Sequence, residues 1–297
     1  MTKRFEIWRL LIALPLVSAL SILIPSNAEA YDLWKEKEIT ENLLPLINES
    51  KHLWLKLENG RKLFALYESN ISQPKKGGVI LLPNINSHVD WPSLIRPLRR
   101  ELTLNGWQVL TIQSPSNSHN LDSIFLLGLP EEIGRRINTA IDHYTSNNIN
   151  NIVLIAHGHS ANLAAQYLHE GSAQKGRILA FAGISFRHYS LSSEWPDSNK
   201  NLERIKIPFL DIHGRLANPL VKEAAHQRLN SAHISGSGTG HRTKQPLTAK
   251  VAELAHNKTG NLAYRQIQLS NSDYNLNESN SNAAKIIRAW LSTHATN

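Results

Sequence analysis

Short, mostly apolar runs alternate along the chain with longer stretches in which apolar residues recur at helical spacing. The short runs have the length and composition of strands that are buried on both faces of a sheet. Strands are expected at residues 79–82, 107–112, 152–156, 178–184 and 208–212, with a last strand at 264–269. Helices are expected at residues 92–105, 131–147, 160–169, 219–229 and 283–291. Because parallel neighbours need right-handed crossovers, this alternation predicts an α/β fold with a mostly parallel sheet and helices on both faces.

An antiparallel hairpin precedes these units. Residues 53–57 and 62–67 alternate apolar and polar positions, and Glu58-Asn59-Gly60 lies between them. An Asn-Gly pair readily adopts the positive φ angles of a tight hairpin turn. The pattern therefore predicts that an antiparallel pair opens the sheet.

The first thirty residues have the composition of a secretory signal. Lys3, Arg4 and Arg9 precede an apolar run at residues 10–25, and Ala28-Glu29-Ala30 supplies small residues suited to signal peptidase. Serine and proline residues interrupt the run, which falls short of the roughly 20 apolar residues of a membrane anchor. We expect residues 1–30 to be a cleaved signal, with an uncleaved anchor as the alternative, and residues 31–297 to form a single domain.

The rest of the chain fits an exported protein without disulfides. It contains no cysteine, so its hydrophobic core alone must stabilise the domain. No later segment is long and apolar enough to span a membrane, so we expect no membrane span after signal cleavage. These features predict a periplasmic protein, with full secretion as the alternative.

The chain is basic, but its basic residues are scattered. It holds 32 Lys and Arg residues against 24 Asp and Glu, a formal charge of +8 that falls to +7 without the signal. Isolated pairs such as Arg99-Arg100 are typical of solvated surfaces, and no stretch interleaves aromatic with basic residues. We expect no nucleic-acid partner. The expected partner is a small molecule, a periplasmic protein or another component of the cell envelope.

Four loops are expected at the carboxyl ends of the strands, where ligands bind in sheets of this kind. They cover residues 83–91, 157–162, 213–218 and 270–275. We expect a ligand crevice there, without a cofactor. The predicted crevice residues are Asn84, His88, Asp90, His157, Gly158 and His213.

One segment resembles a known catalytic element. Residues 152–161, Ile-Val-Leu-Ile-Ala-His-Gly-His-Ser-Ala, resemble the strand, sharp turn and helix that carry the nucleophile of α/β-hydrolases. If Ala156 ends the strand, Gly158 stands at the nucleophile position. A second register makes Ser160 the nucleophile, but it places Asn162 where the turn needs a very small residue. We favour the first register, in which the nucleophile is missing.

The other two positions of a catalytic triad also hold unsuitable residues. Residues 207–218 resemble the hydrolase segment whose strand ends in His-Gly and whose acid follows after two intervening residues, but Ala217 stands at the acid position. Residues 270–275 follow the last strand, where hydrolases place the histidine, and contain Asp273 but no histidine. A triad needs an acid to orient its imidazole. The three positions together predict that serine-hydrolase chemistry is absent.

Several further motifs resemble one bacterial family. Residues 81–92, 95–98 and 105–107, together with the elbow and the closing residues 286–291, resemble the domain of unknown function 3530 family. The resemblance runs from about Trp54 to Leu291 and implies an α/β-hydrolase-like fold, while the family's function is unknown.

The loop after the third strand departs from the hydrolase pattern. Hydrolases commonly place His-Gly there and use a backbone N–H to bind the oxyanion, whereas this chain has Pro83-Asn84, and proline has no N–H. The Asn84 side chain could donate to the oxyanion instead, but we expect it to satisfy its own turn.

Three functions follow from these residues. We favour a noncatalytic protein that binds a ligand or a protein. The alternative is an active serine hydrolase of the esterase or amidase type, which would use Ser160 with Asp211 and one of His159, His157 and His88. The third is a zinc site made from His88, Asp90, His157, His159 and His213.

Two segments are expected to cover the sheet end. Residues 185–201 lie where hydrolases insert a cap, and caps often close over substrates. Residues 235–260 are rich in small and polar residues and are expected to form a flexible, lid-like loop.

Overall fold

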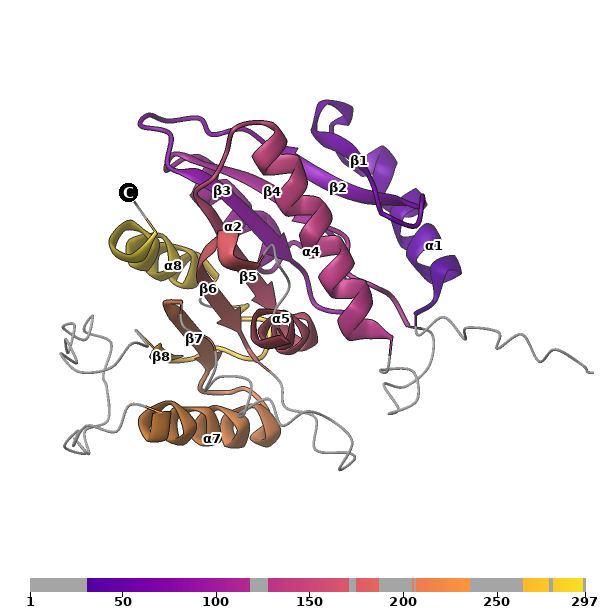
Figure 1. Ribbon diagram of the computed structural model, residues 1–297. Helices are drawn as coiled ribbons and strands as arrows, with labels where there is room; N and C mark the ends of the chain where they lie inside the picture. Colours follow the sequence, from indigo (N-terminus) through magenta and orange to yellow (C-terminus); the bar gives the residue numbers. More distant parts are fainter. Residues whose placement is uncertain are drawn as a thin grey trace, which may run out of the picture.

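The computed structural model describes residues 31–117, 128–170, 175–186, 205, 207–235, 264–277 and 280–295 (Figure 1). The expected signal at residues 1–30 lies outside these ranges. So do residues 187–201 of the expected cap and residues 236–260 of the expected lid. In the described part of the chain, no helix has the length and apolar character needed to cross a membrane.

Eight strands form one mixed sheet. In chain order they are β1 (His52–Lys56), β2 (Lys62–Glu68), β3 (Gly77–Leu82), β4 (Trp107–Ile112), β5 (Ile152–His157), β6 (Ile178–Ile184), β7 (Phe209–Gly214) and β8 (Tyr264–Leu269). Their order across the sheet is β1-β2-β4-β3-β5-β6-β7-β8. β2 pairs antiparallel with β1 and β4, and all other neighbours are parallel. The predicted sheet and its N-terminal hairpin are therefore confirmed.

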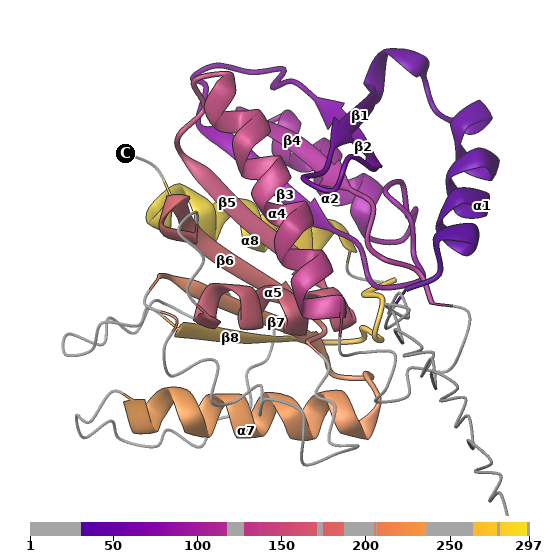
Figure 2. The ribbon, with the colours of Figure 1, turned by 45° about the vertical axis from the view of Figure 1, so that its right-hand side comes forward.

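Helices cover both faces of this sheet. The described ones are α1 (Leu33–Leu43), α2 (Ile95–Thr103), α4 (Leu129–Ser146), α5 (Gly158–Glu170), α7 (Pro219–Ser235) and α8 (Asn280–His294). α4 packs beside α5 on one face, α2 packs beside α8 on the other, and α7 contacts β7 and β8. Figure 2 shows α4 and α5 in front of the strands and α8 behind them.

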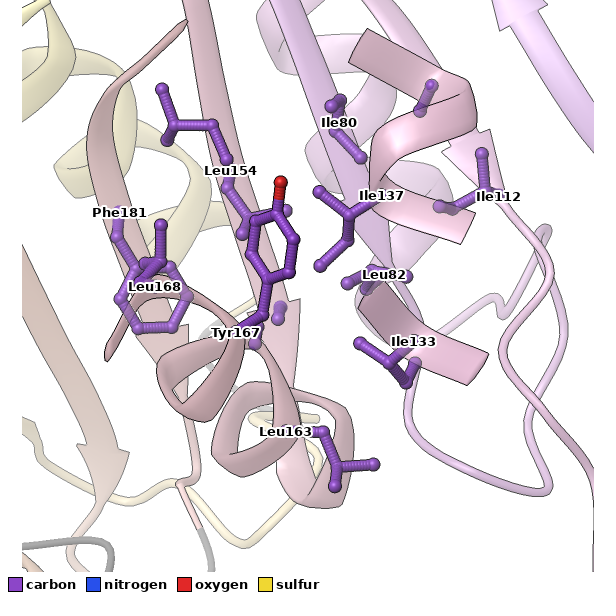
Figure 3. Close-up of a cluster of buried hydrophobic side chains, with 14 of the residues drawn as sticks. Ile80, Leu82, Ile112, Ile133, Ile137, Leu154, Leu163, Tyr167, Leu168 and Phe181 are labelled. Atoms are coloured by element: carbon purple, nitrogen blue, oxygen red, sulfur yellow. The ribbon is translucent and has the colours of Figure 1, made fainter. Parts of the chain in front are cut away.

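The apolar strand runs are buried on both sides, as their pattern predicts. Ile80 and Leu154 face α4 and α5, whereas Val79 and Val153 face α2 and α8, because successive side chains of a strand point to opposite faces. All four side chains are fully buried. Figure 3 shows the first of these clusters, in which residues of the strands meet α4 and Tyr167 of α5.

α1 is a helix that the apolar pattern does not predict. It buries only Thr40 and Leu43, so it lacks an apolar stripe. Polar contacts hold it instead: the Asp32 side chain caps its first turn by accepting from the Lys35 backbone N–H at 3.0 Å. Glu36 forms an ion pair with the fully buried Arg136 of α4, with 2.8 Å between Oε2 and the guanidinium nitrogen.

Candidate functional site

The turn from β5 to α5 is sharper than the sequence predicts. β5 continues to His157 and α5 begins directly at Gly158, whereas the pattern predicts a strand end at Ala156 and a helix start at Ser160. Gly158 allows this turn because its φ of 60° lies in the left-handed region that favours glycine. Gly158 thus occupies the bend, and Ser160 lies within the first turn of α5.

Two side chains fill the space in front of Gly158. A β-carbon added to this glycine would lie 2.7 Å from Asn84 Cγ, and closer still to Asn84 Oδ1 and to Tyr274 Oη. Real β-carbons essentially never approach other heavy atoms within 3.0 Å. No side chain, and hence no nucleophile, fits at this bend while Asn84 and Tyr274 keep their positions.

The N–H that follows the bend is already bonded. In α/β-hydrolases, the N–H of the residue after the nucleophile binds the oxyanion. Here that residue is His159, and its backbone N–H donates to Asn84 Oδ1 at 2.9 Å. The expectation that the Asn84 side chain satisfies its own turn is therefore wrong, because its carboxamide reaches the start of a helix 75 residues further along the chain.

The Ser160 hydroxyl is hydrogen-bonded to another serine, and within the described residues it bonds to no imidazole. Its side chain is fully buried, and its Oγ lies 3.2 Å from Ser114 Oγ. Ser114 in turn donates to the Pro83 carbonyl at 2.5 Å. The structure therefore does not bring Ser160 into a hydrogen bond with His157, the buried histidine before the bend.

Asp211 belongs to a buried ion pair. Arg228 of α7 binds both of its carboxylate oxygens, at 2.8 and 3.1 Å. The Tyr264 hydroxyl and the Gln266 amide donate to Oδ2 at 2.8 and 2.9 Å. Burial alone would raise the pKa of Asp211, but the guanidinium of Arg228 outweighs it and holds this pKa below its ordinary value. The carboxylate is engaged by these donors rather than by an imidazole.

One backbone carbonyl joins three of the loops at the strand ends. His157 Nε2 lies 3.3 Å from the Tyr274 carbonyl oxygen, and the Ser185 hydroxyl donates to the same oxygen at 2.6 Å. His157 is 2% exposed, and this burial lowers its pKa to about 4. The imidazole is therefore neutral at pH 7 and donates its Nε2 proton to the carbonyl.

The candidate residues after β3 form a separate charged group. Asp90 is buried and accepts hydrogen bonds from Arg96, at 2.9 Å from Nε, and from Arg99. Burial alone would raise the pKa of Asp90, but the two arginines hold it below its ordinary value. The His88 ring packs edge-on against Trp91, with 5.3 Å between ring centroids. These contacts fix the loop and leave no carboxylate free for catalysis at Asp90.

The histidine of β7 is buried, and the expected metal set does not assemble. His213 is 4% exposed, its Nε2 lies 3.3 Å from Gln268 Nε2, and burial lowers its pKa. Across the described ranges, which include all five residues of the zinc hypothesis, no three His, Cys, Asp or Glu side chains are grouped as metal ligands. The donor set therefore does not fit a zinc ion.

The residues at the other two triad positions also lie in hydrogen-bonded loops. Ala217 is buried in a loop whose backbone bonds to the loop after β8, for instance from the Leu216 N–H to the Ser272 carbonyl at 2.8 Å. The Asp273 carboxylate accepts from the backbone N–H and the side-chain amide of Asn277, at 3.1 and 2.7 Å. Asp273 therefore stabilises its own turn.

The structure brings together Asn84, His157 and Gly158 of the predicted crevice, and it adds Tyr274. The sequence predicts only a missing histidine for the loop 270–275 and does not predict a role for this tyrosine. The available signal was that Tyr274 is the one aromatic residue of that loop. Its contact with Gly158 joins loops far apart in the chain, which no local pattern encodes.

The sequence matches a family model over most of its length. The model is described as "Protein of unknown function (DUF3530)" and matches residues 33–123 and 128–244. No curated protein matches the chain at a significant level.

Solved structures with the same architecture include esterases and a dienelactone hydrolase. Est1E from Butyrivibrio proteoclasticus is 10% identical, with a TM-score of 0.58 over 82% of this chain and 98% of that chain. The Pyrococcus furiosus esterase Pf2001 is 14% identical, with a TM-score of 0.58 over 82% and 91% of the two chains. A dienelactone hydrolase from Anabaena variabilis is 13% identical, with a TM-score of 0.56 over 82% and 97%. At these identities the likeness confirms the predicted α/β-hydrolase fold and says nothing about activity.

Proposed function

We propose that this chain, which belongs to the DUF3530 family of proteins of unknown function, is an exported, noncatalytic protein with the α/β-hydrolase fold. It would bind a small molecule or a protein of the cell envelope. Such a protein keeps the hydrolase scaffold and has lost the reaction. The same fold carries many functions, so the function of this chain must be inferred from the site itself.

The closed bend at Gly158 carries this proposal. Serine hydrolases need a side-chain oxygen at the bend and a free N–H beside it. Here the bend has no side chain, the carboxamide of Asn84 and the hydroxyl of Tyr274 occupy the space for one, and the neighbouring N–H is bonded to Asn84. These contacts oppose both the attack on a carbonyl and the binding of the resulting oxyanion.

The acids near the site support the same conclusion. Asp211 is bound by Arg228, and Asp273 is bound by Asn277. A hydrolase based on Ser160 would require that hydroxyl to leave Ser114 and reach an imidazole, and Asp211 to leave its arginine. Breaking a buried ion pair of this kind costs about 3–5 kcal/mol.

A fluorophosphonate serine probe tests the proposal. We expect the purified protein, without residues 1–30, to remain unlabelled and to leave p-nitrophenyl acetate hydrolysis at the buffer rate. An active esterase in a parallel sample establishes that the probe works. Ser160→Ala is the matched variant: labelling of the wild type that disappears in Ser160→Ala would overturn the proposal in favour of an active hydrolase.

Export is a separate part of the proposal. Cleavage after Ala30 would leave Tyr31 as the first residue, and its ring lies 4.9 Å from the guanidinium carbon of Arg61 and 5.7 Å from that of Arg136. The described domain thus holds the residue that would become its N-terminus. Expression in a bacterium with two membranes, followed by N-terminal sequencing of the periplasmic fraction, should give Tyr31. An intact Met1 in the membrane fraction would favour the uncleaved anchor.

A further inference from the structure

The first N–H groups of α5 need a partner from elsewhere in the chain. The opening N–H groups of a helix have no acceptor within it and carry partial positive charge. This helix has 13 residues, and its first residue, Gly158, has no side chain that could cap it. Asn84 supplies the acceptor from the loop after β3, with Oδ1 2.9 Å from the His159 nitrogen.

The same carboxamide also occupies the position that a ligand carbonyl would take. Asn84 Cγ lies 2.7 Å from the point where a Gly158 β-carbon would stand, and Tyr274 Oη reaches that point from the loop after β8. A carbonyl group that is bonded to the N–H after the bend has the arrangement of an acyl group in a hydrolase site. Asn84 is only partly buried, so part of its surface is accessible to solvent.

We propose that Asn84 is an internal ligand: its carboxamide closes a carbonyl-oxygen site at the start of α5, and that site accepts a small carboxamide or carboxylate only when the Asn84 side chain is removed. The chain itself thus satisfies the donor that an external carbonyl would use. The inference rests on the proposed function, since a working hydrolase would need this N–H free.

Chemical rescue tests the internal ligand. Asn84→Gly and Asn84→Ala remove the acceptor, and each should lower the melting temperature by roughly 2–4 °C, the shift expected when a domain of this size loses one hydrogen bond. Acetamide at 0.1 M, on the order of the affinity of so small a ligand, should recover about 1 °C of that loss, because a ligand at its Kd stabilises a protein by only RT ln 2. Sodium acetate should do the same, because helix N-termini favour anions.

Two controls separate rescue from a general solvent effect. Asn84→Asp keeps an acceptor oxygen, so it should melt near the wild type and ignore acetamide. Leu82→Ala creates an apolar cavity on the fully buried end of β3, which acetamide should not fill. The backbone amide resonance of His159 should shift with acetamide in Asn84→Ala and stay unchanged in the wild type.

The outcomes divide clearly. If acetamide shifts His159 in the wild type, the site is open, and if it rescues neither Asn84 variant, no carbonyl site exists; either result overturns the inference. If Asn84→Gly does not fold, Asn84→Ala and the His159 resonance still decide the matter. Failure of rescue would leave the noncatalytic function intact, whereas labelling by the fluorophosphonate probe would remove that function whatever the melting curves show.

Discussion

Placing a serine at the bend is the most direct way to test the closed site. Gly158→Ser would supply the missing hydroxyl, yet we expect it to give no esterase activity and a less stable protein. Two effects act against it. A residue with a β-carbon in the left-handed region at φ 60° is strained by about 1–2 kcal/mol, and overpacking against Asn84 and Tyr274 adds about 1–3 kcal/mol.

The combined loss in the free energy of unfolding is therefore about 2–5 kcal/mol, or roughly 4–20 °C in melting temperature for a domain of this size. Circular dichroism melting and urea denaturation measure it directly. Gly158→Ala carries the same strain and the same collision without the hydroxyl, so it should lose a similar amount. The hydroxyl of the serine variant should add no labelling by a fluorophosphonate.

Two other glycines separate strain from collision. A β-carbon at Gly60, with φ 83°, would meet nothing within 4 Å, so Gly60→Ala reports backbone strain alone. A β-carbon at Gly176 also meets nothing, and its φ is not in the left-handed region, so Gly176→Ala should be nearly neutral. If Gly158→Ala were no less stable than Gly60→Ala, the space at the bend would be empty and the reasoning would be refuted.

Three further changes test the buried ionisable side chains. Burial lowers the pKa of His157 from 6.5 to about 4, so on acidification the unfolded state takes up a proton before the folded state does. The contribution of His157 to stability should be complete above pH 6.5, and stability should fall by up to about 3 kcal/mol as the pH drops to 4. In urea denaturation at a series of pH values, His157→Gln should flatten this part of the stability profile. Arg228→Met strands the buried Asp211 carboxylate and should cost about 3–5 kcal/mol. Arg228→Met with Asp211→Leu should restore only part of this loss, because Tyr264 and Gln266 then lack their acceptor; additive losses in Arg228→Met, Asp211→Leu and the double variant would argue against the pair. Glu36→Ala removes the ion pair between α1 and Arg136, so amide hydrogen exchange should become faster in α1 and remain slow in β5. Exchange in α1 that is no faster than in the wild type would contradict the docking of this helix by polar contacts.

The sheet could be predicted because burial on two faces leaves a clear trace in the sequence. Val79 to Leu82 and Ile152 to Ala156 are continuous apolar runs, and each has alternate residues in the two opposite cores. α1 could not be predicted in this way, because it is held by a capped first turn and a buried arginine rather than by an apolar stripe. A helix that is docked by charged side chains has the same sequence pattern as an ordinary solvent-exposed helix.

The site was predictable only one residue at a time. Gly158 and Ala217 stand in recognisable segments, so the residues at those positions could be read directly. The closure of the bend depends on the side-chain reach of Asn84 and Tyr274, which meet Gly158 across 74 and 116 positions of the chain. Such contacts depend on the packing of three loops at the strand ends, and neither residue type implies them.

The closed bend also has a thermodynamic logic. A nucleophile at this position is held at a strained φ, and such strain persists only where function maintains it. Glycine removes the strain, but it leaves an empty space and an unbonded N–H, each of which destabilises a fold. Asn84 and Tyr274 correct both defects at once, since they occupy the space at Gly158 and the carboxamide bonds to His159. A chain released from catalysis would therefore gain stability from the contacts seen here, and reopening the bend would have to oppose that gain.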